Sequence, residues 1–231
     1  MTNPEFTQHV NFKFHEDGRA REFIGNTVIS LVPEASKTMQ VLKELRQAVL
    51  QTNWCSKMAI LPPSSYHMTV FDLVCDQVRD ASHWSSLRSS DAPMGEMDAA
   101  FEAVWKKLPA PSVFSMAFDY LDIGGYITVR LKPVDAAANQ VIRNYRDALS
   151  DAFGVRQPNH DSYFFHISLA YAVRKMSETD LEAAAGLIAS WKDRLETELS
   201  QIDLLPANLV FFDDMSNYAP KRSEAKRNVT E

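Results

Sequence analysis

The most informative segment of this chain reads Ser64-Ser65-Tyr66-His67-Met68-Thr69-Val70-Phe71-Asp72. A similar segment follows 99 residues later, counted between the two histidines, and reads Tyr163-Phe164-Phe165-His166-Ile167-Ser168-Leu169-Ala170-Tyr171. Aromatic and β-branched residues are frequent in both segments, and neither contains glycine or proline, which is typical of β-strands. The sequence therefore predicts one strand of this kind in each half of the chain.

The two faces of each predicted strand differ, because successive side chains of a strand point to opposite sides. One face is expected to carry a histidine beside a hydroxyl residue, and its members are His67, Thr69 and Phe71 in the first strand and Phe164, His166, Ser168 and Ala170 in the second. The opposite faces are apolar and suited to burial. Tyr66 and Tyr171 fall on these apolar faces and are expected to pack in the core.

The bare pattern His-x-Ser/Thr has little specificity, since four of the six histidines of the chain fit it. His83 and His160 also stand two residues before a serine, but both lie in polar segments with turn composition. We expect these two histidines in surface loops. The strand context distinguishes His67 and His166 from them.

Composition limits the classes of function. A net charge of −6 disfavours binding of long nucleic acids, which require a basic surface. It leaves room for a small phosphorylated substrate, which a few local donors can hold. The two cysteines form neither a disulfide framework nor a metal-binding spacing. No signal peptide or membrane-spanning run is recognised, so we expect a cytoplasmic, monomeric protein with no membrane partner.

Strands and helices alternate along the chain, and one hairpin interrupts this order. We expect strands at 25–32, 113–120, 126–131 and 209–212, helices at 34–51, 97–108, 135–153 and 177–195, and a long loop at 76–95. Residues 1–22 are predicted to be an N-terminal arm, 23–220 a single domain, and 221–231 a charged, solvated tail. The order of elements suggests two similar lobes, each of which contributes one histidine strand.

Two imidazoles that flank one bound group can divide acid–base work, because imidazole titrates near neutral pH. This pairing suits in-line attack on phosphorus, in which a nucleophile loses a proton and the leaving oxygen gains one. The hydroxyls of Thr69 and Ser168 would hydrogen bond to the non-bridging phosphate oxygens. Such chemistry needs no metal and no cofactor, and we predict neither.

Three other interpretations of the histidines remain open at this point. Each could be an ordinary core or edge histidine, although two matching strands weigh against this. Both could be zinc ligands, but nearby sequence offers no evident third ligand. A Ser-His-Asp hydrolase is disfavoured, because the chain has no Gly-x-Ser-x-Gly motif.

The segments His67-Met68-Thr69-Val70 and His166-Ile167-Ser168-Leu169 resemble the paired motifs of the two-histidine (2H) phosphoesterase superfamily. Its members include RNA 2′,3′-cyclic phosphodiesterases of the 2′-5′ RNA ligase type and plant cyclic nucleotide phosphodiesterases. Gly25-Asn26-Thr27 and the residues around His67 resemble more closely a poorly characterised branch. The chain departs from many members by a serine in the second motif and by a longer region at 76–95.

The resemblance implies an α+β, bilobal fold with two pseudo-symmetric antiparallel sheets backed by helices, and a central cleft that carries both motifs. It implies that His67 and His166 are the acid–base pair, without deciding which is the base, and that Thr69 and Ser168 contact phosphate. The expected activity is hydrolysis of a cyclic phosphate in a 2′,3′-cyclic nucleotide or at an RNA end. The alternative is a non-catalytic module on the same fold that binds a phosphate, a nucleotide or an RNA end.

Four further residues are candidates for lining the cleft. Asn26 lies near a predicted strand of the same sheet system, although a turn role is equally compatible with the sequence. Arg130 could meet a phosphate, although a solvent-facing arginine at a strand end fits its position better. Phe71 and Phe164 share the histidine faces and could stack on a base, and core packing is the competing interpretation.

Overall fold

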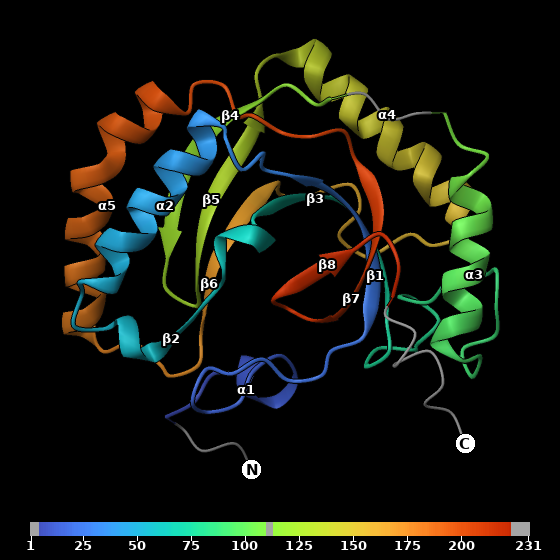
Figure 1. Cartoon of the computed structure of the whole chain (residues 1–231), viewed down its shortest axis with the longest axis horizontal. Helices are drawn as coiled ribbons and strands as arrows, with labels where there is room; N and C mark the ends of the chain where they lie inside the picture. Colours follow the sequence, from blue (N-terminus) through green and yellow to red (C-terminus); the bar gives the residue numbers. More distant parts are fainter. Residues whose placement is uncertain (1–4, 110–112, 223–231) are drawn as a thin grey trace.

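One curled antiparallel sheet forms the centre of the computed structural model, which describes residues 5–109 and 113–222 (Figure 1). Its strands are β1 (Gly25–Leu31), β2 (Met58–Ile60), β3 (His67–Cys75), β4 (Met116–Ile123), β5 (Tyr126–Pro133), β6 (His166–Ala172), β7 (Asn208–Asp214) and β8 (Asn217–Ala219). They are ordered β4-β5-β6-β3-β1-β7-β8 across the sheet, and β2 pairs with β6. The predicted α+β class is therefore confirmed.

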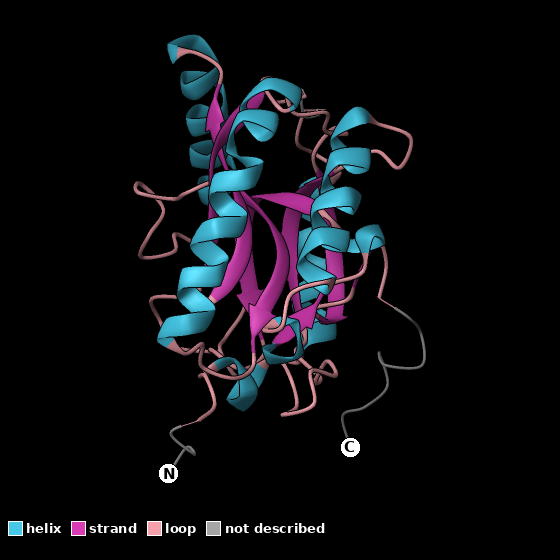
Figure 2. Cartoon of the chain, turned by 90° about the vertical axis from the view of Figure 1, so that its left-hand side faces the viewer, coloured by secondary structure: helices cyan, strands magenta, loops and turns pink. Residues whose placement is uncertain are grey.

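Helices cover the sheet from two sides. They are α1 (His9–Phe12), α2 (Lys37–Leu50), α3 (Met94–Trp105), α4 (Ala136–Phe153) and α5 (Glu178–Glu198), with two short 3₁₀ turns at Cys55–Lys57 and Pro63–Ser65. Helices α2 and α5 lie along one side of the sheet, and α3 and α4 lie along the other (Figure 1). In the perpendicular view the strands run between these groups of helices (Figure 2).

The two halves of the sheet have the same construction. In each half a helix lies in sequence between two strands that pair antiparallel, as β1-α2-β3 in one half and β5-α4-β6 in the other. The short strand β2 is an addition between α2 and β3. The halves meet where β3 pairs with β6 at Met68 and Ile167. The predicted two lobes are thus present, but their sheets are joined into one. Each half contributes one histidine strand next to this junction.

Local signals explain where the long helices begin and end. The Ser36 hydroxyl accepts a hydrogen bond from the Met39 amide at the start of α2. Ser177 and Asp180 form a reciprocal capping box that opens α5. Gly154 ends α4 in the left-handed region at a φ of 61°, a conformation that favours glycine over residues with a Cβ.

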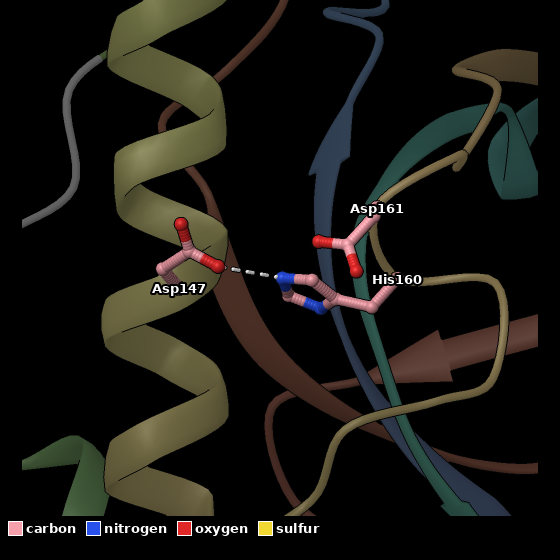
Figure 3. A group of neighbouring side chains, drawn as sticks. All are labelled: Asp147, His160 and Asp161. Carbon is pink, nitrogen blue, oxygen red and sulfur yellow. Dashed lines mark hydrogen bonds and ion pairs between the residues drawn. The ribbon is translucent and has the colours of Figure 1, made fainter.

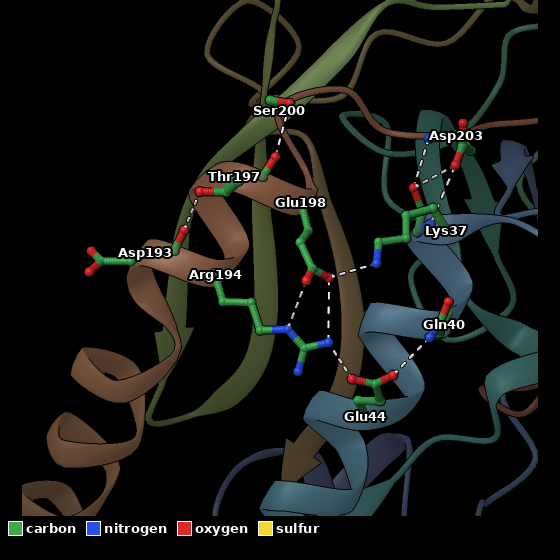
Figure 4. Close-up of polar contacts among 10 residues, drawn as sticks. Lys37, Gln40, Glu44, Asp193, Arg194, Thr197, Glu198, Ser200 and Asp203 are labelled. Carbon is green, nitrogen blue, oxygen red and sulfur yellow. Dashed lines mark hydrogen bonds and ion pairs between the residues drawn. The ribbon is translucent and has the colours of Figure 1, made fainter.

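Charged side chains join α2 to α5 on the outer surface (Figure 4). Arg194 of α5 contacts Glu44 of α2 and also Glu198, at 3.3 Å. The Lys37 ammonium of α2 lies 3.1 Å from the same Glu198 carboxylate. These pairs are partly exposed at the surface, where solvent screening keeps the contribution of each one small. They fix the orientation of two helices whose apolar sides already pack on the core.

The N-terminal segment 5–22 is part of the packed structure, although the sequence predicts only an arm. Phe6, Val10 and Phe14 are buried, and they recur at four-residue spacing, which is a helical signal among polar residues. The backbone amide of Thr7 donates to the Val173 carbonyl at 3.0 Å, at the end of β6. The segment therefore reaches the edge of the histidine strands.

The C-terminal end of the described chain is also buried. Arg222 is 6% exposed and donates from Nε to Asp98 at 2.8 Å and from Nη2 to the Gly25 carbonyl at 2.9 Å. Residue 222 thus belongs to the core, whereas residues 221–231 are predicted from sequence as a solvated tail; residues 223–231 lie outside the described part. No helix in the described part is both long and apolar enough to cross a membrane.

Candidate active site

The two motif histidines are brought together at the junction of the two half-sheets. His67 opens β3 and His166 opens β6. Because Met68 pairs with Ile167 in an antiparallel register, His67 faces Ser168 across the strands and Thr69 faces His166. Each imidazole therefore lies beside the hydroxyl of the other motif.

Both imidazoles are held in the same way by the chain that precedes them. His67 Nδ1 lies 2.6 Å from the Ser65 carbonyl oxygen, and His166 Nδ1 lies 2.9 Å from the Phe164 carbonyl oxygen. A carbonyl only accepts, so each Nδ1 carries the proton and donates it. In the neutral ring Nε2 then holds a lone pair, which is the arrangement that a proton acceptor needs.

A one-residue irregularity follows each motif at the same distance from its histidine. The register between β1 and β3 shifts between Thr69 and Phe71, and the register between β5 and β6 shifts between Ser168 and Ala170. An extra residue at such a bulge reverses the alternation of faces beyond it. Asp72 and Tyr171, each five residues after its histidine, are partly exposed and line the cleft, whereas Phe71 and Ala170 are buried.

A cleft of about 630 Å³ lies over the two motifs. Its lining includes His67, Thr69, His166 and Ser168, as the sequence predicts, and the carboxyl group of Asp72. The other cleft residues are supplied mainly by the N-terminal segment, by the loops around 78–83 and 157–159, and by strands β7 and β8. A volume of this size accommodates a nucleotide-sized ligand.

The cleft disfavours charge on its histidines before a ligand binds. Burial, together with a smaller effect of the neighbouring His166, lowers the pKa of His67 to about 4, against the opposing effect of the hydrogen bond to the Ser65 carbonyl. Burial also lowers the pKa of His166, while the Asp72 charge acts in the opposite direction. Both rings are therefore neutral at pH 7 in the free protein, although each keeps a partly exposed edge.

Four groups, Arg146, His166, Lys13 and Tyr163, act on the carboxyl of Asp72. Burial raises the pKa of Asp72, and Arg146, His166 and a hydrogen bond from Tyr163 oppose this effect. The Tyr163 hydroxyl also shares a hydrogen bond with Thr69, and burial keeps the pKa of Tyr163 well above its ordinary value. Asp72 and Tyr163 therefore connect the first motif to His166. The strict alternation assumed for the sequence leaves both of them unassigned.

Asn26 lines the cleft, but its amide is engaged in structural hydrogen bonds. Its Nδ2 donates to Asp98 at 3.0 Å, and its Oδ1 accepts from the Val74 amide at 3.1 Å. The side chain is 2% exposed. Asn26 thus fixes the start of β1 against β3 and the buried Asp98–Arg222 pair.

The other three cleft candidates lie elsewhere. Phe71 is 1% exposed and belongs to the core, because the bulge turns it away from the histidine face. Arg130 pairs with His166 across β5 and β6, outside the cleft lining, and its Nη2 lies 3.1 Å from Asp122. Phe164 is 71% exposed and is not among the residues that line the cleft, and the Arg130 guanidinium lies 6.0 Å from its ring.

The other two histidines of His-x-Ser sequences, His83 and His160, lie in different environments. His83 is partly exposed at the cleft edge and bonds to Asp80. His160 lies in a turn as predicted, but its side chain is only 4% exposed. Its Nε2 is 2.9 Å from Asp147, and its ring packs edge-on against Phe71 at 5.7 Å between centroids. The His160 side chain is buried because it packs against the ring of Phe71.

Asp147, His160 and Asp161 are grouped closely enough to resemble metal ligands (Figure 3). The guanidinium of Arg156 already bridges the two carboxylates, at 3.2 Å from Asp147 and 2.5 Å from Asp161. A cation would have to displace this arginine. The group lies outside the residues that line the cleft, and it is an ion-paired cluster of two exposed carboxylates with the buried His160.

Sequence reasoning also missed aromatic and basic residues that the fold brings to the cleft. Tyr218 of β8 places its ring 4.4 Å from that of His67, between centroids. Tyr171 lines the cleft, although strict alternation assigns it to the core. Lys13 enters from the N-terminal segment. Lys13 and Tyr218 come from opposite ends of the chain, so no local pattern links them to the motifs.

Comparisons with known proteins agree with this fold. Residues 13–125 match the family model 2H-phosphodiest, described as a domain of unknown function (DUF1868). The solved structure of a conserved protein of unknown function, ATU0111 from Agrobacterium tumefaciens strain C58, is 27% identical, covers 94% of this chain and 92% of its own, and has a TM-score of 0.88. An uncharacterized protein, 127L of Invertebrate iridescent virus 6, is 33% identical over 63 residues, and the match spans 27% of each chain.

Proposed function

The chain belongs to the 2H phosphoesterase superfamily, and from this premise we propose that it is a metal-independent phosphodiesterase that hydrolyses a cyclic phosphate. The substrate class is a 2′,3′-cyclic nucleotide or an RNA end. The observation that carries the proposal is the matched anchoring of two imidazoles, each with Nδ1 on a backbone carbonyl, at one end of adjacent strands.

The reaction divides two proton transfers between these rings. One neutral imidazole accepts a proton at Nε2 from the attacking water as the new P–O bond forms. The other imidazole, protonated, donates its Nε2 proton to the ribose oxygen as the P–O bond of the ring breaks. The product is a phosphomonoester beside a free hydroxyl. Water supplies all the atoms that are added, and proton exchange with solvent returns the two rings to their starting protonation states before the next turnover.

The protonated ring forms when the substrate binds. Burial lowers the pKa of both His67 and His166, so neither carries a proton at pH 7 in the free protein. An anionic phosphodiester between the rings favours an imidazolium and raises the pKa of the ring that receives the proton. The charge of Asp72 favours the same change on His166.

The hydroxyls of Thr69 and Ser168 are placed to stabilise the transition state. Each lies two residues after its histidine, and both line the cleft. We assign them as donors to the two non-bridging phosphate oxygens, where negative charge increases during attack. Asp72 is the one carboxyl group among the described residues of the lining, so the cleft offers little to bind a divalent metal.

The test is hydrolysis of a panel of 2′,3′-cyclic nucleotides and a cyclic-phosphate-ended oligonucleotide, in the presence of EDTA. Wild type is compared with His67→Ala and His166→Ala, and with His15→Ala as a control histidine that lies outside the cleft lining. We expect turnover that resists EDTA, falls by at least about 100-fold in each motif variant, and persists in the control.

Two results would reject the proposal. Turnover that survives in either motif variant would show that the imidazoles do not carry the proton transfers. A folded wild type that binds these compounds without converting them would instead support the alternative of a non-catalytic binding module. Circular dichroism of every variant establishes that a loss of turnover is not a loss of fold.

A further inference from the structure

Lys13 places a positive charge in the cleft, although it is far from both histidine motifs in the sequence. Its side chain lines the cleft together with Phe23 and Tyr171. The ammonium lies 5.0 Å from the centre of the Tyr171 ring and 5.3 Å from that of Phe23. Two aromatic rings therefore hold the cation at the wall of the cleft.

The position of Lys13 is fixed by the backbone around it. Its amide donates to the His9 carbonyl at 2.9 Å, and its carbonyl accepts from the Arg21 amide at 2.8 Å. The buried rings of Phe6 and Phe14 attach the same segment to the core. Lys13 is thus presented by a packed element, which gives its side chain a defined origin above β6.

The charge of Lys13 has no ionic partner within the part of the chain that the structure describes. No carboxylate in that part of the chain lies within 4.0 Å of its ammonium, whereas Lys37, Lys43 and Lys57 each form an ion pair. The charge nevertheless acts on the pKa values of Asp72 and His166, which places it within electrostatic reach of the reacting groups. An unpaired cation in a cleft favours an anionic ligand.

The distance along β6 separates this charge from the site of reaction. Tyr171, which seats the ammonium, lies five residues beyond His166, roughly 15 Å at the spacing of a strand. A single cyclic phosphate between the histidines does not extend over this length. A nucleotide with a second phosphate on its 5′ oxygen extends further toward Lys13, and the side chains of Lys13 and His166 cover the rest of this backbone distance. The cleft volume of about 630 Å³ admits such a ligand.

We propose that Lys13 forms a second anionic subsite, which takes a terminal phosphate of a nucleotide whose cyclic phosphate lies between His67 and His166. The position of the cyclic phosphate between the histidines rests on the proposed phosphodiesterase function, whereas the anionic subsite at Lys13 does not. The subsite itself concerns binding. It makes the N-terminal segment a determinant of substrate selection and favours 5′-phosphorylated substrates over those with a free 5′-hydroxyl.

The first experiment compares adenosine 2′,3′-cyclic phosphate with and without a 5′-phosphate as substrates. Three variants accompany wild type. Lys13→Met removes the charge and keeps an apolar stem against the rings, Lys13→Arg keeps the charge, and Lys192→Met removes a lysine from the exposed surface of α5. We expect wild type and Lys192→Met to prefer the 5′-phosphorylated substrate by roughly tenfold or more in kcat/KM. Lys13→Met should lose that preference and Lys13→Arg should keep it.

A second experiment measures binding without turnover. Calorimetry gives dissociation constants of adenosine 3′,5′-bisphosphate and adenosine 3′-monophosphate for the same proteins. A preference of wild type for the bisphosphate that disappears in Lys13→Met supports the subsite even if no cyclic phosphate is hydrolysed. Equal affinities in wild type, or a preference that Lys13→Met retains, would overturn the subsite while leaving the phosphodiesterase assignment intact.

Discussion

Arg146 holds the bulge that shapes the site, and its replacement by methionine should be strongly destabilising. This arginine is 2% exposed on α4. Its Nη1 donates to the Val70 carbonyl at 2.5 Å, and its Nη2 donates to the His160 carbonyl at 3.1 Å. The Val70 carbonyl belongs to the irregular step of β3 that turns Asp72 into the cleft.

The magnitude follows from what methionine leaves behind. Two buried carbonyls lose their donors, at about 1–3 kcal/mol each. The loss of the guanidinium from above the Tyr163 ring, 4.3 Å away, adds about 1 kcal/mol. Against this, burial lowers the pKa of Arg146, so the charge itself is costly to bury, and an apolar chain of similar length recovers part of that cost. We expect a net loss of about 2–4 kcal/mol in the free energy of unfolding.

Urea denaturation followed by tryptophan fluorescence measures this loss directly, and a thermal melt should show a midpoint lower by roughly 5–15 °C. Arg88→Met is the matched control, because Arg88 is exposed and donates only to the carbonyl of Leu87. The control should change the free energy of unfolding by at most about 0.5 kcal/mol. A loss below about 1 kcal/mol in Arg146→Met would refute the reasoning, because it would mean that the two carbonyls find other donors.

Three further predictions concern charges near the cleft. Replacing Arg222 by leucine leaves the buried carboxylate of Asp98 without its partner, so urea titration should show a loss of about 3–5 kcal/mol; a neutral change would contradict the pairing. Asp72→Asn removes a charge that raises the pKa of His166, so the pKa of that ring in an NMR titration should fall, and a rise would contradict the assignment. Burial lowers the pKa of His67 from 6.5 to about 4, so between these values the unfolded chain binds a proton that the folded chain does not. The free energy of unfolding should therefore decrease as the pH falls through this window, and His67→Gln should make the decrease shallower; an unchanged slope would count against it.

Elements with strong local signals were predictable from the sequence. The helices that begin at Ser36, Asp135 and Ser177 have capping side chains, and all three caps form in the structure. The two histidine strands were predictable because their composition is local. The packing of the N-terminal segment was not, since Phe14 contacts Tyr171 of β6 and Phe6 contacts Arg174, both more than 150 residues away in sequence. Lys13 depends on that packing and was missed with it.

The faces of the histidine strands were predicted correctly only as far as the bulges. Strict alternation puts Asp72 on the same face as Met68 and Val70, which would bury a carboxyl group in the core. That conflict is a readable signal, because two adjacent apolar residues, Val70 and Phe71, precede the aspartate and provide the extra core position that a bulge needs. The same reasoning applies to β6 in the other half of the sheet, where the apolar residues Leu169 and Ala170 precede Tyr171. A shift in phase at the same place in both halves brings one charged and one aromatic residue to the cleft, so the irregularity is better understood as part of the site than as a defect of the sheet.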